Sequence, residues 1–215
     1  MILTSLLRLK RNTIMMSVPF FILFVFLPVL VALLYFFYKD NPEAFLRESV
    51  RHLHVWIPLF ASWWSLLLVD DFFDDEGNEL LYLDHRPLYF PAAWCVTTAL
   101  YGIFTAVFFV VVKQILPVGF FLLAQLVVES IFMSFLSFAL CFLFLNTGIS
   151  FLAAVFYCVY LNLFDSLRLL SFLSVFPEES IATPQTVNLC RDAGLAAVLF
   201  FAGGFLCARF HRCYK

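Results

Sequence analysis

Charged side chains are scarce in this sequence. Only 13% of its 215 residues are Asp, Glu, Lys or Arg, whereas 64% are apolar, and the mean hydropathy is +0.98. A soluble globular domain carries about twice that charged fraction. The shortage of charge therefore excludes a chain whose main solvent is water. At about 20 residues per membrane-crossing helix, the length accommodates about six spans and almost no domain outside the membrane.

Three chemical signatures are also missing. The net charge is −2 and no basic patch occurs, which argues against a nucleic-acid partner. The six cysteines show no C-x-x-C or Cys/His spacing, so the sequence supports neither a disulfide framework nor a zinc site. No G-x-x-x-x-G-K-[ST] motif occurs, so any ATP hydrolysis would belong to another polypeptide. We expect no catalytic residue, metal or cofactor in this chain.

Long apolar runs dominate what is present, and they predict an all-α, polytopic membrane protein that forms a single domain over 1–215. A short stretch of alternating leucine and basic residues at 2–12 predicts a helix lying in the membrane interface. The apolar run 167–176, which is followed by Pro177, is too short to cross and predicts a re-entrant outer segment over 166–186. Asn146-Thr147-Gly148 is a turn signal between two runs. The predicted spans are 17–38, 52–69, 88–112, 117–145, 149–164 and 193–210.

Six spans place both termini on one side of the membrane. Basic residues are concentrated at the two ends of the chain, which favours the cytoplasmic side for both termini and a location in the cell membrane. The residues of these terminal clusters are Arg8, Lys10, Arg11, Arg209, Arg212 and Lys215.

In this topology the segment 70–87 is a cytoplasmic loop, and it concentrates acidic charge. Its seven acids stand against Arg86 alone, and they are Asp70, Asp71, Asp74, Asp75, Glu76, Glu79 and Asp84. One interpretation is a solvated anionic loop. Another is a docking surface, because leucines interleave with the acids and a short charged, Leu-bearing helix can enter a groove on a cytosolic partner.

A third interpretation is enzymatic. The residues Asp70–Asp75 resemble the D-D-x-x-D signature of prenyl-transferring enzymes, in which paired carboxylates hold magnesium against a diphosphate. Such membrane enzymes carry a second aspartate cluster, whereas Asp165 and Asp192 stand alone here. The pattern of phosphatidyltransferases is not matched either, since Asp75-Glu76-Gly77 is not followed by their Ala-Arg. A small metal-dependent membrane transferase, or a scaffold subunit that transports nothing, therefore stays as an alternative.

Taken in order, the interfacial segment 2–12, the acidic loop and the outer segment 166–186 resemble the permease subunits of type-2 ABC transporters. The loop is similar to the family's acidic-Gly-x-x-Glu-x-Leu element, which ends in a turn containing Pro and Arg. The resemblance implies that this element is a coupling helix seated in a separate cytosolic ATPase, which binds ATP and magnesium. It also implies a second permease copy, identical or related, in the same bilayer. The residues to which the resemblance assigns ATPase coupling are Asp74, Asp75, Glu76, Gly77, Glu79, Leu80, Leu81 and Arg86.

Glu129 is the most unusual residue within a predicted span. A bare carboxylate near the middle of a membrane is expensive, so it should be protonated, paired or facing a wet cavity. It is a candidate pathway or gating residue, or else a neutral acid that is hydrogen-bonded to a neighbouring helix, or to Ser130 or Gln125 at its own turn. The abundant aromatic residues would line any pathway with apolar walls. We therefore expect an amphipathic cargo, such as a peptide, a lipid-like or a drug-like compound, and export as its direction.

Overall fold

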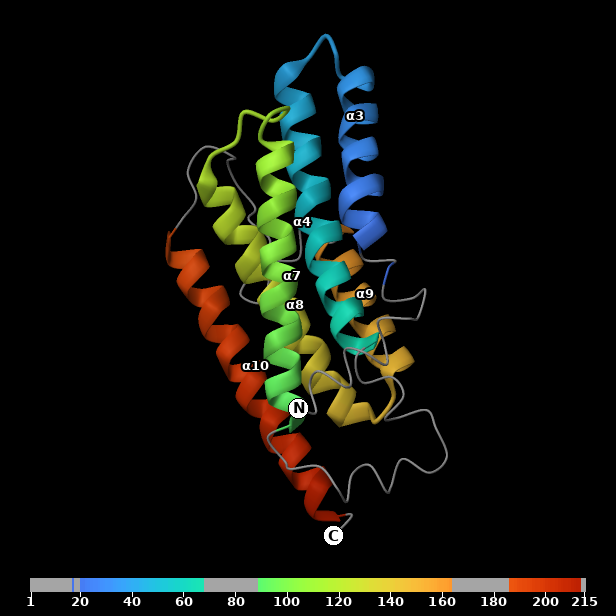
Figure 1. The fold of residues 1–215 in the computed structure, drawn as a ribbon, viewed down its shortest axis with the longest axis vertical. Helices are drawn as coiled ribbons and strands as arrows, with labels where there is room; N and C mark the ends of the chain where they lie inside the picture. Colours follow the sequence, from blue (N-terminus) through green and yellow to red (C-terminus); the bar gives the residue numbers. More distant parts are fainter. Residues whose placement is uncertain (1–16, 18–19, 68–88, 164–185, 214–215) are drawn as a thin grey trace.

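The computed structural model describes residues 17, 20–67, 89–163 and 186–213, and within this part of the chain every regular element is a helix. Figure 1 shows an elongated bundle whose helices follow its long axis, with α4 running down the view, α7 up and α8 down again. The predicted segments 2–12 and 70–87, and all of 166–186 except Thr186, lie outside the described residues. The elements are η1 (Ile22–Phe26), α3 (Leu27–Phe37), α4 (Pro42–Leu67), α7 (Tyr89–Val112), α8 (Phe120–Phe144), α9 (Thr147–Leu163) and α10 (Thr186–Cys213).

Three helices are long and apolar enough to cross a membrane. They are Phe90–Val112, Phe120–Phe144 and Leu189–Arg209, which overlap three of the predicted spans. Large apolar side chains also cover the outside of the bundle, a surface that suits lipid rather than water. Among the most exposed are Phe36, Phe37, Phe156, Phe201 and Phe205.

The first apolar helix contains a proline without ending there. Pro28 has no N–H, so the carbonyl of Phe24, four residues earlier, loses its usual donor. The residues before it form a π-helical stretch, η1, and the N–H of Leu27 donates to the carbonyl of Ile22. This change of hydrogen-bond register accommodates the proline, and α3 continues to Phe37.

Helix α4 starts earlier than the span predicted at 52–69. Asn41 caps it, because its side-chain oxygen accepts a hydrogen bond of 3.1 Å from the N–H three residues further on, and Pro42 occupies the first helical position. The first turns of α4 are charged on one side and apolar on the other. A search for uniformly apolar runs therefore underestimates the length of this helix. The residues that these turns bury are Phe45, Ser49, Val50 and Leu53.

A tight turn joins α8 to α9. Leu145 ends α8 in the left-handed conformation, with φ of 53°, and its N–H donates to the carbonyl of Cys141 at 2.8 Å. Asn146 then caps α9, since its side-chain oxygen accepts from the N–H of Ile149 at 2.8 Å. The turn lies where Asn146-Thr147-Gly148 predicted it.

Helix α8 forms the centre of the bundle and packs most extensively against α10 and α4. Gly203 of α10 is buried against the ring of Phe138, so the two backbones approach closely at this point. The Cβ position of Gly204 has no neighbour within 4 Å, and Ala193 and Ala197 are exposed. Among the small residues at these four positions, Gly203 is therefore the one that permits the α8–α10 contact.

Candidate functional site

The residues assigned to ATPase coupling lie in the segment between α4 and α7, outside the described residues. The positions of its flanking helices are known. α4 ends at Leu67 and α7 begins at Tyr89, both at the end of the bundle where α10 also ends (Figure 1).

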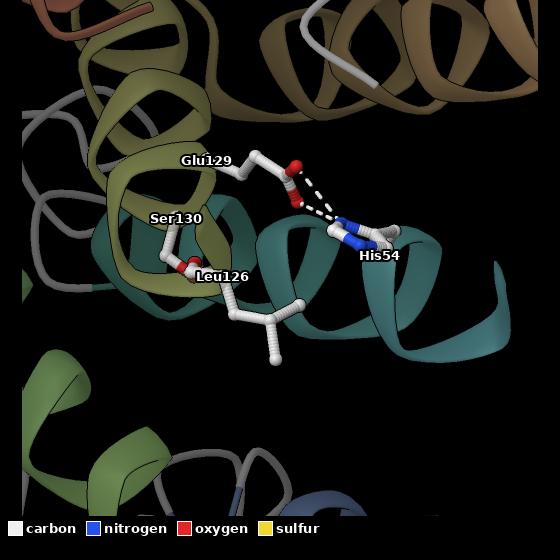
Figure 2. A network of polar contacts seen from close by, with 4 residues as sticks. All are labelled: His54, Leu126, Glu129 and Ser130. Carbon is white, nitrogen blue, oxygen red and sulfur yellow. Dashed lines mark hydrogen bonds and ion pairs between the residues drawn. The ribbon is translucent and has the colours of Figure 1, made fainter. Parts of the chain in front are cut away.

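Glu129, the predicted gating candidate, lies inside the bundle and is paired with a histidine. Its carboxylate contacts the imidazole of His54 on α4, with Nδ1 2.6 Å from Oε2 and 2.8 Å from Oε1. Figure 2 shows the Glu129 side chain reaching from α8 towards α4, where the ring of His54 meets it. The exposed fraction is 8% for the His54 side chain and 2% for that of Glu129. The two residues thus form a buried polar contact between helices that are far apart in sequence.

The partner comes from a neighbouring helix rather than from Ser130 in the same turn. Ser130 lies next to Glu129 (Figure 2), but its hydroxyl donates to the carbonyl of Leu126 at 2.7 Å. Such a bond along the helix satisfies the serine locally and leaves Glu129 to find a partner elsewhere. The sequence did contain a signal for that partner, since His54 is a titratable residue within the predicted span 52–69.

A seam of hydroxyl groups continues from this pair along the interface of α4, α7 and α8. Its hub is Ser134, whose Oγ lies 2.7 Å from Ser65 Oγ and 2.6 Å from Thr98 Oγ1 and accepts a bond of 2.9 Å from the indole of Trp94. Ser62 of α4 and Ser137 of α8 are also hydrogen-bonded to each other. Small hydroxyl side chains let helices approach closely and bind one another within an apolar surrounding.

A proline removes one bond from the regular hydrogen bonding of α4 beside the pair. Pro58 lacks an N–H, so it cannot donate to the carbonyl of His54, four residues earlier. In the same stretch the hydroxyl of Tyr101 on α7 donates to the carbonyl of Ile57 at 2.7 Å. The turn after His54 thus lacks one bond of its own helix and gains one from α7.

A second charged pair lies on the α10 side of Glu129. Asp192, which stood alone in the sequence analysis, is buried and accepts a bond of 2.9 Å from Nε of the preceding Arg191. Asp192 interacts electrostatically with Glu129, and so does Cys158 of α9. Polar groups from α4, α9 and α10 thus interact with one carboxylate of α8.

The chemistry available here concerns protons and helix contacts. Within the described part of the chain no three His, Cys, Asp or Glu side chains come together in a way that could hold a metal ion. A protonated histidine beside an ionised carboxylate is neutral as a pair, which lowers the cost of keeping both away from water. Comparisons of the chain with protein-family models, with curated proteins and with solved structures found no match.

Proposed function

We propose that this chain is the membrane permease subunit of an ATP-driven transporter of the type-2 ABC class, which works with a separate cytosolic ATPase. The proposal starts from the resemblance of the acidic loop to that family's coupling element. The observation that carries it further is the placement of α4. Its lower end precedes the loop in the chain, and its side chains are hydrogen-bonded to the central helix α8 at His54 and Ser65.

The mechanism follows from that connection. When ATP closes the ATPase dimer, the acidic loop moves with it and pulls on the ends of α4 and α7. The polar contacts of α4 and α7 with α8, at His54, Ser65 and Thr98, pass that movement to the centre of the bundle. Alternating access then exposes an amphipathic cargo first to one side of the membrane and then to the other, in the direction of export.

The complete assembly in this proposal has six spans per subunit, with η1 and α3, α4 and α9 crossing beside the three long apolar helices. Both termini and the acidic loop face the cytoplasm, and a second permease copy completes the pathway. In Figure 1, α4 ends and α7 begins towards the end of the bundle at which α10 also ends, which supports one side of the membrane for the acidic loop and the end of α10.

Co-purification tests the proposal. The full chain, carrying an affinity tag, is purified from its native cells in mild detergent, and a co-purifying protein with a P-loop motif is sought. We expect Glu79→Lys and Gly77→Pro to abolish that association. The matched control is Glu43→Lys, which makes the same charge change on an exposed residue at the opposite end of α4. Association that persists in both loop variants, or no P-loop protein in the wild-type sample, contradicts the proposal.

A further inference from the structure

We propose that His54 and Glu129 form a proton-binding site inside the bundle, in which one proton taken from water is held as an imidazolium–carboxylate pair. The proposal concerns the chain itself and does not depend on its cargo or on an ATPase.

The geometry defines which atom carries which proton. Nδ1 of His54 lies within hydrogen-bonding distance of both carboxylate oxygens, at 2.6 and 2.8 Å. A protonated Glu129 would present one hydrogen and leave its other oxygen against the nitrogen lone pair, which is repulsive. An N–H at Nδ1 shared between two oxygens of an ionised carboxylate has no such conflict, and its short distances match a charge-assisted bond.

The second ring nitrogen is then the atom that binds the additional proton. No hydrogen bond to Nε2 occurs among the described residues, and the His54 side chain keeps 8% of its surface exposed. A hydronium ion gives its proton to Nε2: an N–H bond forms on the ring, an O–H bond of the hydronium breaks, and a water molecule is left. The pair changes from a net charge of −1 to zero, which is the favoured charge for a site buried among apolar side chains.

One further charge acts on the site. From α10, Asp192 adds a negative charge beside Glu129, which favours the protonated pair, and Arg191 is the partner of Asp192. From α9, Cys158 interacts with Glu129. On α7 the hydroxyl of Tyr101 is engaged with the carbonyl of Ile57, and on α3 the ring of Tyr35 packs on Phe45 of α4. On α4 itself, Glu48 is bridged to Arg51 at 3.8 Å, and His52 is the other histidine.

The proton has a mechanical consequence. While it is bound, the pair is a neutral ionic contact that ties α4 to α8. If it leaves, an uncompensated carboxylate stays in the apolar interior, and this state requires water to enter or the two helices to separate. The site therefore couples the protonation of one nitrogen to the α4–α8 interface.

Nitrogen NMR of the histidine ring tests the proposal directly. The full chain is placed in phosphatidylcholine nanodiscs at pH 7.5 with ¹⁵N-labelled histidine, in a background where His52→Gln, His85→Gln and His211→Gln leave His54 as the only histidine. We expect both ring nitrogens of His54 to carry a proton. Glu129→Gln, which removes the charge, should convert the ring to the form with one N–H, whereas Ser130→Ala should leave both protons in place.

A ring with one N–H in the background protein overturns the proposal, and so does a doubly protonated ring that Glu129→Gln leaves unchanged. If Glu129→Gln does not yield monodisperse protein, Glu129→Asp keeps the charge and should keep both protons. In that case the test is the number of N–H groups on the His54 ring in the background protein and in Glu129→Asp. A single N–H in either protein contradicts the proposed proton-binding site.

Discussion

The ring of Phe138 on α8 lies directly over the backbone of Gly203 on α10. A Cβ added to Gly203 would lie 2.8 Å from Cε1 of that ring and closer still to Cδ1, whereas a Cβ added to the neighbouring Gly204 would meet nothing within 4 Å. Two consecutive glycines on one helix therefore have different roles. One sets the distance between α8 and α10, and the other does not.

Substitution of the two glycines should separate these roles. We expect Gly203→Ala to destabilise the folded protein by about 1–3 kcal/mol, because the new methyl group overpacks against Phe138. Gly204→Ala, the matched control, should change stability by less than about 1 kcal/mol, and in the stabilising direction, because alanine favours a helix. Thermal unfolding in detergent, monitored by size-exclusion chromatography, measures the stability of both variants. Equal losses in the two variants would show that the contact with Phe138 is not limiting.

The His54–Glu129 pair should behave as a coupled unit in a double-mutant cycle. Removing one partner leaves the other buried and unpaired, so we expect His54→Leu to cost about 3–5 kcal/mol of stability. His54→Leu combined with Glu129→Leu removes both polar groups and should cost less than that single change. Chemical unfolding of these two variants and of Glu129→Leu alone, in mixed micelles, gives the three values needed. Strictly additive losses would mean that the contact contributes nothing of its own.

The hydroxyl seam should tolerate the loss of its hub. In Ser134→Ala the indole of Trp94 can still donate to the backbone carbonyl of residue 134, at 3.0 Å. The hydroxyls of Ser65 and Thr98 can still donate to backbone carbonyls of their own helices. Each partner therefore retains an acceptor, and we expect a loss of about 0.6–1.7 kcal/mol, in the range of hydrogen bonds between membrane helices. Ser130→Ala, which affects a bond within α8 alone, is the reference in the same unfolding assay. A loss well above that range would indicate that these carbonyls do not compensate.

The accessibility of single thiols should report which side of the membrane each end of the bundle faces. In a variant whose own cysteines are replaced, Gln114→Cys places a thiol at an exposed position between α7 and α8, and Asn78→Cys places one in the acidic loop. We expect an impermeant maleimide to label Gln114→Cys in intact cells, and to label Asn78→Cys only after the cells are lysed. Glu43→Cys, exposed at the same end as residue 114, should follow Gln114→Cys. Labelling of Asn78→Cys in intact cells would place the acidic loop outside and remove the basis for ATPase coupling.

The class of the molecule is determined by the sequence alone, because it depends on local composition. Charge is so scarce, and the apolar runs are so long, that the sequence predicts helices able to cross a membrane, and the described part of the chain contains three such helices. The turn at Asn146 was readable for the same reason, since capping is a property of a few neighbouring residues. The first turns of α4 were not recognised, because their stability comes from one buried face rather than from an apolar run.

The tertiary structure decided which residues meet. Nothing in the spacing of the chain pairs position 54 with position 129, or distinguishes Gly203 from Gly204. These relationships depend on how each helix is rotated about its axis and how closely it packs, and both are set by contacts between side chains that are distant in sequence. The sequence by itself identified Glu129 as a residue in need of a partner, and the packing of α4 on α8 selected His54.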